Sequence, residues 1–444
     1  MKKNLRGRFG MAVAVLGLSA SAVVPAVAAT APTYTIDSIM VNDLTIKAAN
    51  APTADITMGG SSFVSNLVGP ALAHYKAINT EKSVAAYDGT LGSTNGRKRV
   101  TGAGSPAVNV GFSDFPLQNS GSSYVDGSSD SFSYTVGSGS ASNFAQLPVA
   151  LGGVAITYNI PDLGTSALQK LLAKTPLTLT GLQVGQIFSQ TITKWNDPSI
   201  CATNKTLVKT VKIKNKNTKV CALPDATIRV ITRAAGSGTT YMFKDYLSKV
   251  DPTHFPAADS AVFAKSASGT DIPSTANSAE MAAKIDSIDN SIGYVEYGFA
   301  AVTPGVNVAA IVNKSGKAVL PNATTVAAAA AAKTGFAMTS LATRSLNNLT
   351  GTTVYPIAGY AYAILLKAQT NKNNGITAVK VLDYLTHQGG AGTAGRPFTK
   401  ANTYGQDYAA VTGYVALPKS IQTLARDILK TVTYDGAVLL NTTN

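Results

Sequence analysis

The chain has 444 residues and a formal net charge of +14 at pH 7, and this length accommodates two domains of ordinary size with buried cores. An excess of basic residues fits binding to an anionic cell surface or to small anions, or simply a solvated basic face. Nucleic acid is disfavoured as a partner, because no dense run of Lys and Arg is interleaved with aromatic residues.

The first 28 residues have the pattern of a secretory signal peptide. A basic start, MKKNLRGRFG, precedes the apolar run MAVAVLGLSASAVVPAVA and an exit of small residues ending at Ala28. The run contains Pro25 and many small residues, so a membrane anchor is disfavoured. No cysteine stands near the expected cut before Ala29, which argues against a lipid tether through an N-terminal cysteine.

Cleavage before Ala29 leaves 416 residues with a formal charge of +10. No later stretch reaches the roughly 18 consecutive apolar residues that a spanning helix needs. We therefore expect a soluble mature protein outside the cytoplasm, in the periplasm or secreted.

The remaining chain predicts an α/β fold. Residues 29–53 are polar, lack strong periodicity and are expected to form an N-terminal extension. From residue 54, short β-branched runs such as VALGGVAITYNI alternate with helical segments such as SFVSNLVGPALAHYKAI, which predicts largely parallel sheets. The serine- and glycine-rich residues 118–142 interrupt this alternation and are expected to form an exposed loop.

Three segments place small hydroxyl residues where a strand gives way to a helix. They are GGSSFV at 59–64, GTLGSTNG at 89–96 and RAAGSGTT at 233–240. The first N–H groups of a helix lack partners, and the helix dipole favours negative charge there. One such end is usually an ordinary N-cap. Three in one α/β chain, one of them beside an arginine, favour an anion site.

Asp114, in VNVGFSDFPL, follows a predicted buried strand. A carboxylate at an anion site is repulsive unless the anion brings a proton. Phosphate near neutral pH does so and sulfate does not, and buried polar groups left unmatched give large discrimination. A plain turn or cap role for Asp114 fits its spacing equally well.

Cys201 and Cys221 are the only cysteines, and they flank the lysine-rich segment CATNKTLVKTVKIKNKNTKVC. In a chain sent to an oxidising compartment they are expected to form one disulfide that closes a hairpin-like insert. A loop of this length gains about 3 kcal/mol from restriction of the unfolded chain. A metal or redox site is disfavoured, because there is neither a further cysteine nor CxxC spacing.

Enzymatic interpretations find little support, and no catalytic residue, metal ligand or cofactor is predicted. The segment AAGSGTT lacks the GK[ST] ending of a P-loop, which argues against nucleotide hydrolysis. Only His74, His254 and His387 could serve as the base for a serine nucleophile, and none lies in a recognisable motif.

Taken together, these segments resemble the periplasmic phosphate-binding proteins that serve the high-affinity phosphate ABC importer. The resemblance covers nearly the whole mature chain, in the family's order, and its most specific pieces are QIFSQTITKWNDPSI and IGYVEYGFA. It implies a type II, two-lobed fold with mixed, mainly parallel sheets flanked by helices, and a cleft that closes on one phosphate without catalysis. It also implies a monomer whose partners are inorganic phosphate and a membrane permease with its cytoplasmic ATPase.

The resemblance also implies site residues and lobe boundaries. Lobe one would comprise 54–159 and 298–444, and lobe two 160–297, because the family's chain crosses between lobes twice. Asp114 would accept the phosphate proton, while Arg233 would supply the compensating charge. The remaining phosphate contacts would come from Ser62, the backbone N–H of Phe63, Ser93, Ser237, Gly238 and Thr239.

Three positions depart from the family's pattern. Ala235 stands where the family usually has an aspartate that orients the arginine. Ser62 replaces the usual threonine but keeps the hydroxyl, and Asn95 stands where glycine is frequent.

Two other functions remain open from the sequence. The first is a secreted or surface-exposed interaction protein on the same fold, suggested by the basic charge and the extra loops. The second, less favoured, is a secreted phosphatase, for which metal ligands or a nucleophile with its base are not visible. Arsenate would satisfy the same donors as phosphate.

Overall fold

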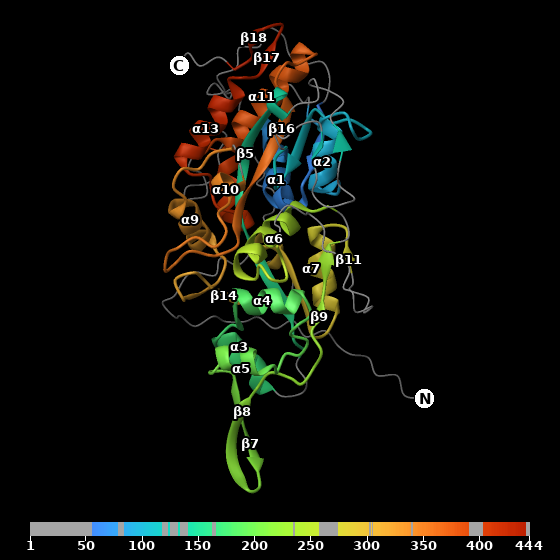
Figure 1. The fold of residues 1–444 in the computed structure, drawn as a ribbon. Coiled ribbons are helices and arrows are strands. Elements are labelled where there is room, and N and C mark those ends of the chain that lie inside the picture. The colour runs from blue at the N-terminus through green and yellow to red at the C-terminus, as the bar shows by residue number, and fades with distance from the viewer. Residues whose placement is uncertain are drawn as a thin grey trace, which may run out of the picture.

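A computed structural model of the chain describes residues 56–78, 84–117, 123–124, 132–133, 141–161, 166–233, 236–256, 274–301, 303, 305–338, 341–389 and 403–440. The predicted signal peptide, the extension 29–53, most of the loop 118–142 and Ala235 lie outside the described residues. Figure 1 shows an elongated molecule in which helices flank a central sheet, and two lobes follow one another along the long axis.

The central sheet has the strand order β1-β2-β16-β5-β12-β9, with β13 also paired to β5. Its strands are β1 (Met58–Gly60), β2 (Val110–Ser113), β5 (Phe144–Asn159), β9 (Arg229–Val230), β12 (Ser291–Glu296), β13 (Asn307–Val308) and β16 (Ala358–Leu366). The pairs β1–β2 and β9–β12 are parallel, whereas β5 is antiparallel to β16, β12 and β13. The α/β class is as expected, but the pairing is mixed rather than mainly parallel.

The connections account for the parallel pairs of the sheet only. Parallel neighbours need a crossover, usually a helix, and helices do lie between β1 and β2 and between β9 and β12 along the chain. Helices also lie between β5 and each of its partners along the chain, yet β5 runs antiparallel to all three of them. Strand period and composition do not reveal this orientation, because buried parallel and antiparallel strands share the same apolar residues.

Strand β5 belongs to both lobes. Its residues Phe144–Gly153 pair with β16, and its residues Val154–Asn159 pair with β12. The change of partner therefore falls directly after Gly152 and Gly153. In Figure 1 this strand runs along the long axis from the first lobe into the second.

The first lobe surrounds β16 and the start of β5. Its elements are η1 (Ser62–Val64), α1 (Ser65–Ile78), α2 (Gly92–Val100), η3 (Ala141–Asn143), α11 (Lys372–Thr386), η4 (Gly405–Tyr408), α12 (Ala409–Thr412), α13 (Lys419–Leu429), β17 (Thr433–Tyr434) and β18 (Ala437–Val438). Helices α9 (Ala323–Ala332) and α10 (Leu341–Arg344) lie beside the junction of the lobes, and β3 (Ser123–Tyr124) pairs with β4 (Phe132–Ser133).

The second lobe surrounds β12 and the end of β5. Its elements are α3 (Ser166–Lys174), β6 (Thr178–Thr180), α4 (Gly181–Phe188), α5 (Pro198–Thr203), β7 (Val208–Ile213), β8 (Lys216–Cys221), β10 (Thr232–Arg233), α6 (Gly238–Val250), β11 (Ser274–Thr275), α7 (Ser278–Ser287), α8 (Tyr297–Ala300), β14 (Ala310–Val312) and β15 (Ala318–Val319). Although β13 and β14 follow residue 297, they pair with β5 and β6. The boundaries at 159/160 and 297/298 stay predictions.

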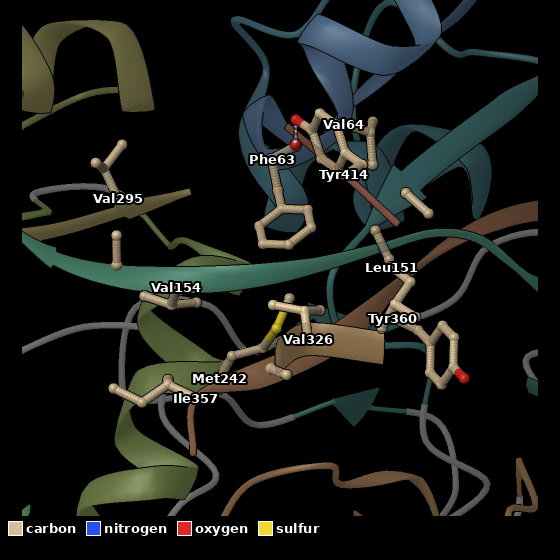
Figure 2. Close-up of a cluster of buried hydrophobic side chains, with 14 of the residues drawn as sticks. Phe63, Val64, Leu151, Val154, Met242, Val295, Val326, Ile357, Tyr360 and Tyr414 are labelled. Atoms are coloured by element: carbon tan, nitrogen blue, oxygen red, sulfur yellow. Dashed lines mark hydrogen bonds between the residues drawn. The ribbon is translucent and has the colours of Figure 1, made fainter. Parts of the chain in front are cut away.

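The core at the junction fixes the backbone of η1. Figure 2 shows Phe63 and Tyr414 on one side of β5 and Met242 and Val326 on the other. The Phe63 ring lies directly on the strand, because a Cβ built at Gly152 would stand 2.6 Å from its Cζ atom. Tyr414 donates its hydroxyl proton to the carbonyl oxygen of Phe63. Burial of a side chain of this size contributes roughly 2–3 kcal/mol and anchors the first helix start.

The lysine-rich insert forms a hairpin, as expected. Strands β7 and β8 pair antiparallel through their whole length, and Cys201 forms a disulfide with Cys221. Lys214 and Asn215 make the turn with φ angles of 45° and 60°. Figure 1 shows this hairpin projecting from the end of the second lobe, away from the rest of the molecule.

Candidate functional site

The first wall of the site is the start of η1. Ser61 is its N-cap, and the Ser61 Oγ atom accepts a hydrogen bond from the N–H of Phe63 at 3.0 Å. The same hydroxyl donates to Oδ1 of Asp114. Gly60 has φ +144°, and a Cβ there would stand 2.0 Å from the carbonyl oxygen of Phe112. Only glycine lets this turn lie so close to β2.

Asp114 follows β2 and joins this wall to α2. Its side chain is buried, and its N–H donates to Oγ of Ser93 in the first turn of α2 at 3.3 Å. Burial is the main cause that raises the pKa of Asp114 to about 7. The negative charge of Glu296 raises this pKa further, whereas the hydrogen bonds from Ser61 and Ser93 and the charge of Arg233 lower it.

The second wall is the start of α6. Ser237 is the N-cap of this helix, and its Oγ atom accepts from the N–H of Thr240 at 3.3 Å. A Cβ built at Gly238 would stand 2.4 Å from both Cβ and Oδ2 of Asp114. The start of α6 therefore lies against Asp114, and the two lobes meet across these residues.

Arg233 lies on β10 and is buried. Its Nη2 donates to the carbonyl oxygen of Ala276 at 2.8 Å, and its Nη1 donates to Oγ of Ser278 at 3.4 Å. The backbone N–H of Arg233 donates to the hydroxyl of Tyr294 at 3.3 Å. Within the described structure, Nε of Arg233 is buried without a hydrogen-bond partner. The guanidinium group is thus held in place with donor capacity left over.

Glu296 and Ser278 belong to the site, although the sequence did not identify them. Oε1 of Glu296 accepts from Oγ1 of Thr239 at 2.6 Å and from Oγ of Ser278 at 2.9 Å. Oγ of Ser278 also lies 2.7 Å from Oγ of Ser62. Glu296 is 1% exposed, and its Oε2 is buried with no partner among the described atoms. These contacts link the first helix start to the second lobe.

A signal for Ser278 was present in the sequence. Asn277 is the N-cap of α7, and its side chain accepts from the N–H of Glu280 at 2.9 Å. An asparagine followed three residues later by glutamate marks a helix start. Ser278 therefore stands at a fourth helix start, besides the three that the sequence predicted. Glu296 lies in the distinctive segment IGYVEYGFA, but a local pattern gives no reason to place its side chain in the site.

All eight predicted residues are buried, and their contacts form two sets that meet through the chain neighbours Ser62–Phe63 and Gly238–Thr239. Ser62, Ser278, Glu296 and Thr239 are joined by hydrogen bonds, and Arg233 joins them at Ser278. The rest of the set lies on the Asp114 side and comprises Phe63, Ser93, Ser237 and Gly238. Helix starts, hydroxyl groups and one guanidinium suit an anion. Two buried carboxyl groups suit an anion that carries protons.

The histidines lie elsewhere. His74 is buried in the first lobe with its Nδ1 2.7 Å from the hydroxyl of Tyr384, and burial lowers its pKa to about 4. Nδ1 of His254 lies 2.8 Å from Oδ2 of Asp251, and the ring of His387 packs against the ring of Tyr404. Within the ranges that the structure describes, no three His, Cys, Asp or Glu side chains could hold a metal. None of the described helices has the length and apolar character needed to cross a bilayer.

Comparison with known proteins supplies a family. A family model for the PBP superfamily domain matches residues 45–434. The chain is similar to the phosphate-binding protein PstS of Xylella fastidiosa, with 28% identity over 315 residues, 71% of this chain and 72% of that one. It is also similar to the phosphate-binding protein PstS of Haemophilus influenzae, with 28% identity over 64% of this chain and 72% of that one.

The fold has a solved counterpart. The structure of a high-affinity periplasmic phosphate-binding protein, PfluDING bound with phosphate, matches 88% of this chain and 97% of its own at a TM-score of 0.57. The two sequences are 17% identical, so this likeness bears on the fold alone. It agrees with the two lobes joined through a shared sheet.

Proposed function

The chain belongs to the PBP superfamily, and we propose that it is a solute-binding protein that captures inorganic phosphate and delivers it to an ABC importer. One observation carries the proposal: the buried group of hydroxyls, Arg233 and two carboxyl groups where the lobes meet. The PstS relatives support the choice of phosphate.

Charge balance and protons together give the selectivity. Arg233 compensates part of the anion's charge, and the starts of η1, α2 and α6 direct N–H and hydroxyl donors at it. Asp114 accepts a hydrogen bond from a protonated phosphate oxygen. Sulfate carries no proton, so above pH 7, where Asp114 is mostly ionised, it would leave that buried carboxylate facing an unmatched oxygen, which is costly.

Glu296 orients the arginine in this scheme. The family's usual aspartate is replaced by Ala235, and Glu296 reaches Arg233 through the hydroxyl of Ser278. A buried negative charge joined to the arginine through one hydroxyl stabilises the charged guanidinium group and limits its rotation. We therefore assign Glu296 and Ser278 as positioning residues, and the eight predicted residues as the phosphate contacts.

The cellular setting follows from the same proposal. The mature protein begins at Ala29, works as a monomer in the periplasm, and meets a permease coupled to a cytoplasmic ATPase. Closure of lobe one (54–159 and 298–444) on lobe two (160–297) buries the phosphate, and the hinge motion occurs where the chain crosses between them. We expect osmotic shock to release the protein from the periplasm. Recovery of the protein from the cell exterior would favour a surface interaction protein instead.

A secreted phosphatase is the third candidate. The described partners of His74, His254 and His387 are Tyr384, Asp251 and Tyr404, which lie outside the buried group, so we assign no histidine base to its serines. We expect no release of product from a chromogenic phosphate ester, and steady release would replace the receptor proposal.

Calorimetric titration tests the proposal. Residues 29–444 are stripped of bound phosphate by partial unfolding and refolding, then titrated with phosphate and sulfate at equal ionic strength. We expect one-to-one phosphate binding and negligible heat with sulfate. Asp114→Asn should reduce the ratio of phosphate affinity to sulfate affinity by about fivefold to a hundredfold, since one unmatched buried group costs roughly 1–3 kcal/mol.

The matched control is Asp427→Asn, because Asp427 is exposed and pairs with Lys430 on the surface. It should leave both titrations unchanged. Equal affinity of the unmodified protein for phosphate and sulfate would contradict the role of Asp114. No binding heat with either anion would contradict the receptor function.

A further inference from the structure

The hairpin of the second lobe carries an unusual concentration of positive charge. We call residues 205–221 the lysine hairpin. Between Asp197 and Asp225 the sequence contains no acidic residue. Its six lysines are all exposed: Lys205, Lys209, Lys212, Lys214, Lys216 and Lys219. None of them forms an ion pair with an acid in the described part of the chain.

The tip of the lysine hairpin also exposes an apolar side chain. Ile213 is 49% exposed and pairs with Lys216 next to the turn. Residues that pair across antiparallel strands share a face, and alternate residues share it too. Ile213 therefore lies on the same face as the partly buried Val211 and Val220. Lysines 212, 214 and 216 surround it along the chain.

The lysine hairpin is held at its base and free at its tip. Leu207 is fully buried before β7, and Ala222 is 5% exposed after β8. The disulfide joins the end of β8 to α5. In Figure 1 the strands then extend beyond the lobe with no other element beside them. This arrangement leaves the tip of the hairpin accessible to a partner.

We propose that the lysine hairpin binds the surface of an anionic phospholipid bilayer. Its lysines would lie among the lipid phosphates, and Ile213 would enter the boundary between head groups and acyl chains. A soluble polyanion would satisfy the lysines but leave Ile213 in water, so the apolar tip favours the bilayer. Each lysine near an anionic surface adds about fivefold to the affinity. The proposal is independent of what the cleft binds.

Vesicle sedimentation tests it. The chain from Ala29 is mixed with vesicles of phosphatidylglycerol and phosphatidylcholine, and with vesicles of phosphatidylcholine alone, at low salt. We expect binding to the anionic vesicles only, weakened by added salt. The triple variant Lys212→Gln, Lys214→Gln, Lys216→Gln should lose about a hundredfold in affinity, and Ile213→Ser about tenfold.

The matched controls lie at the turn between β14 and β15 and directly after β15. Lys314 and Lys317 are exposed there, and Leu320 is 38% exposed. The variants Lys314→Gln with Lys317→Gln, and Leu320→Ser, should bind anionic vesicles as tightly as the unmodified protein. All variants are checked for an unchanged unfolding midpoint and an unchanged phosphate titration.

Two results would overturn the proposal. Equal retention on anionic and neutral vesicles, or triple-variant binding as tight as that of the unmodified chain, would remove the lysine hairpin from any membrane contact. An effect of the lysines without any effect of Ile213→Ser, together with tight binding to heparin in solution, would assign the hairpin to a soluble polyanion instead. Because phosphate titration is recorded separately, failure here leaves the receptor proposal standing.

Discussion

The predicted cleft, meaning the buried group around Arg233 and Asp114, and the lysine hairpin use charged side chains in opposite ways. In the cleft, Arg233 lies among two buried acids and several hydroxyls, and most of their polar atoms have a defined hydrogen-bond partner. In the hairpin, six exposed lysines stand without a neighbouring acid. Buried groups discriminate between ligands because each unmatched one is costly. Exposed charges attract any anionic surface, and salt screens them. The buried group therefore suits selective binding of one anion, and the exposed hairpin suits unselective attraction to an anionic surface.

Substitution of Arg233 should give the largest difference between the effect on phosphate binding and the effect on vesicle binding. Arg233→Ala is expected to weaken phosphate binding by roughly 2–4 kcal/mol, as loss of a buried charge partner does, and to leave vesicle binding unchanged. Calorimetry and vesicle sedimentation measure the two effects. The control is Arg229→Ala, since Arg229 is exposed on β9. Unchanged phosphate affinity in Arg233→Ala would remove this residue from the site.

The disulfide should affect the hairpin and spare the cleft. The double variant Cys201→Ser, Cys221→Ser is expected to lower the free energy of unfolding by about 3 kcal/mol, because the unfolded chain regains the freedom of the closed loop. Urea denaturation measures this change. Phosphate titration should be unaltered. An equal loss of phosphate affinity would mean that the hairpin and the cleft are coupled.

The pH dependence of stability should come from the cleft. The pKa of Asp114 in the folded protein is about 7, above its ordinary value of 3.8. The folded state therefore holds this proton more tightly than the unfolded state, and the stabilisation present at low pH is lost as pH rises from about 4 through about 7. Between pH 5 and pH 8 the phosphate-free protein should lose about 2–3 kcal/mol relative to Asp114→Asn.

Urea denaturation of both proteins at several pH values provides the test. The comparison with Asp114→Asn cancels the titration of groups that both proteins share, such as His74. Parallel stability curves for the two proteins would show that Asp114 keeps an ordinary pKa in the folded state.

The smallest expected effect concerns Ser278. Ser278→Ala removes the hydroxyl that connects Ser62, Arg233 and Glu296, and should weaken phosphate binding by about 1 kcal/mol. Ser287→Ala is the control, because Ser287 is exposed at the other end of α7. Equal phosphate affinity in the two variants would exclude Ser278 from positioning the arginine.

Local chemistry allowed part of this molecule to be predicted. Two cysteines in a secreted chain predicted the disulfide, and small hydroxyl residues at or next to the first turn predicted the starts of η1, α2 and α6. A helix cap depends on residues within one turn of the helix start, and the disulfide depends on two cysteines in one short loop. Both kinds of feature can therefore be recognised from a short stretch of sequence. The predicted site residues form one buried group, although their contacts with phosphate stay a prediction.

The features that sequence missed depend on distant contacts. Ser62 and Ser278 are 216 residues apart, and no sequence pattern near either residue predicts its contact with the other. Glu296 ends a buried strand, where its side chain could face either lobe until the neighbours of β12 are known. The antiparallel setting of β5 likewise depends on β16, which lies about 200 residues further along the chain. Such placements are decided by packing of whole elements.

Strand β5 has a consequence for dissecting the protein into pieces. Its first ten residues complete the sheet of one lobe and its last six complete the sheet of the other. A fragment of the first lobe alone must therefore include part of β5 or leave the edge of β16 uncovered. A fragment of the second lobe alone must include part of β5 or lose the strand that pairs with both β12 and β13. Recombinant halves of this chain are expected to aggregate or remain unfolded, and reassembly would require both halves in the same vessel.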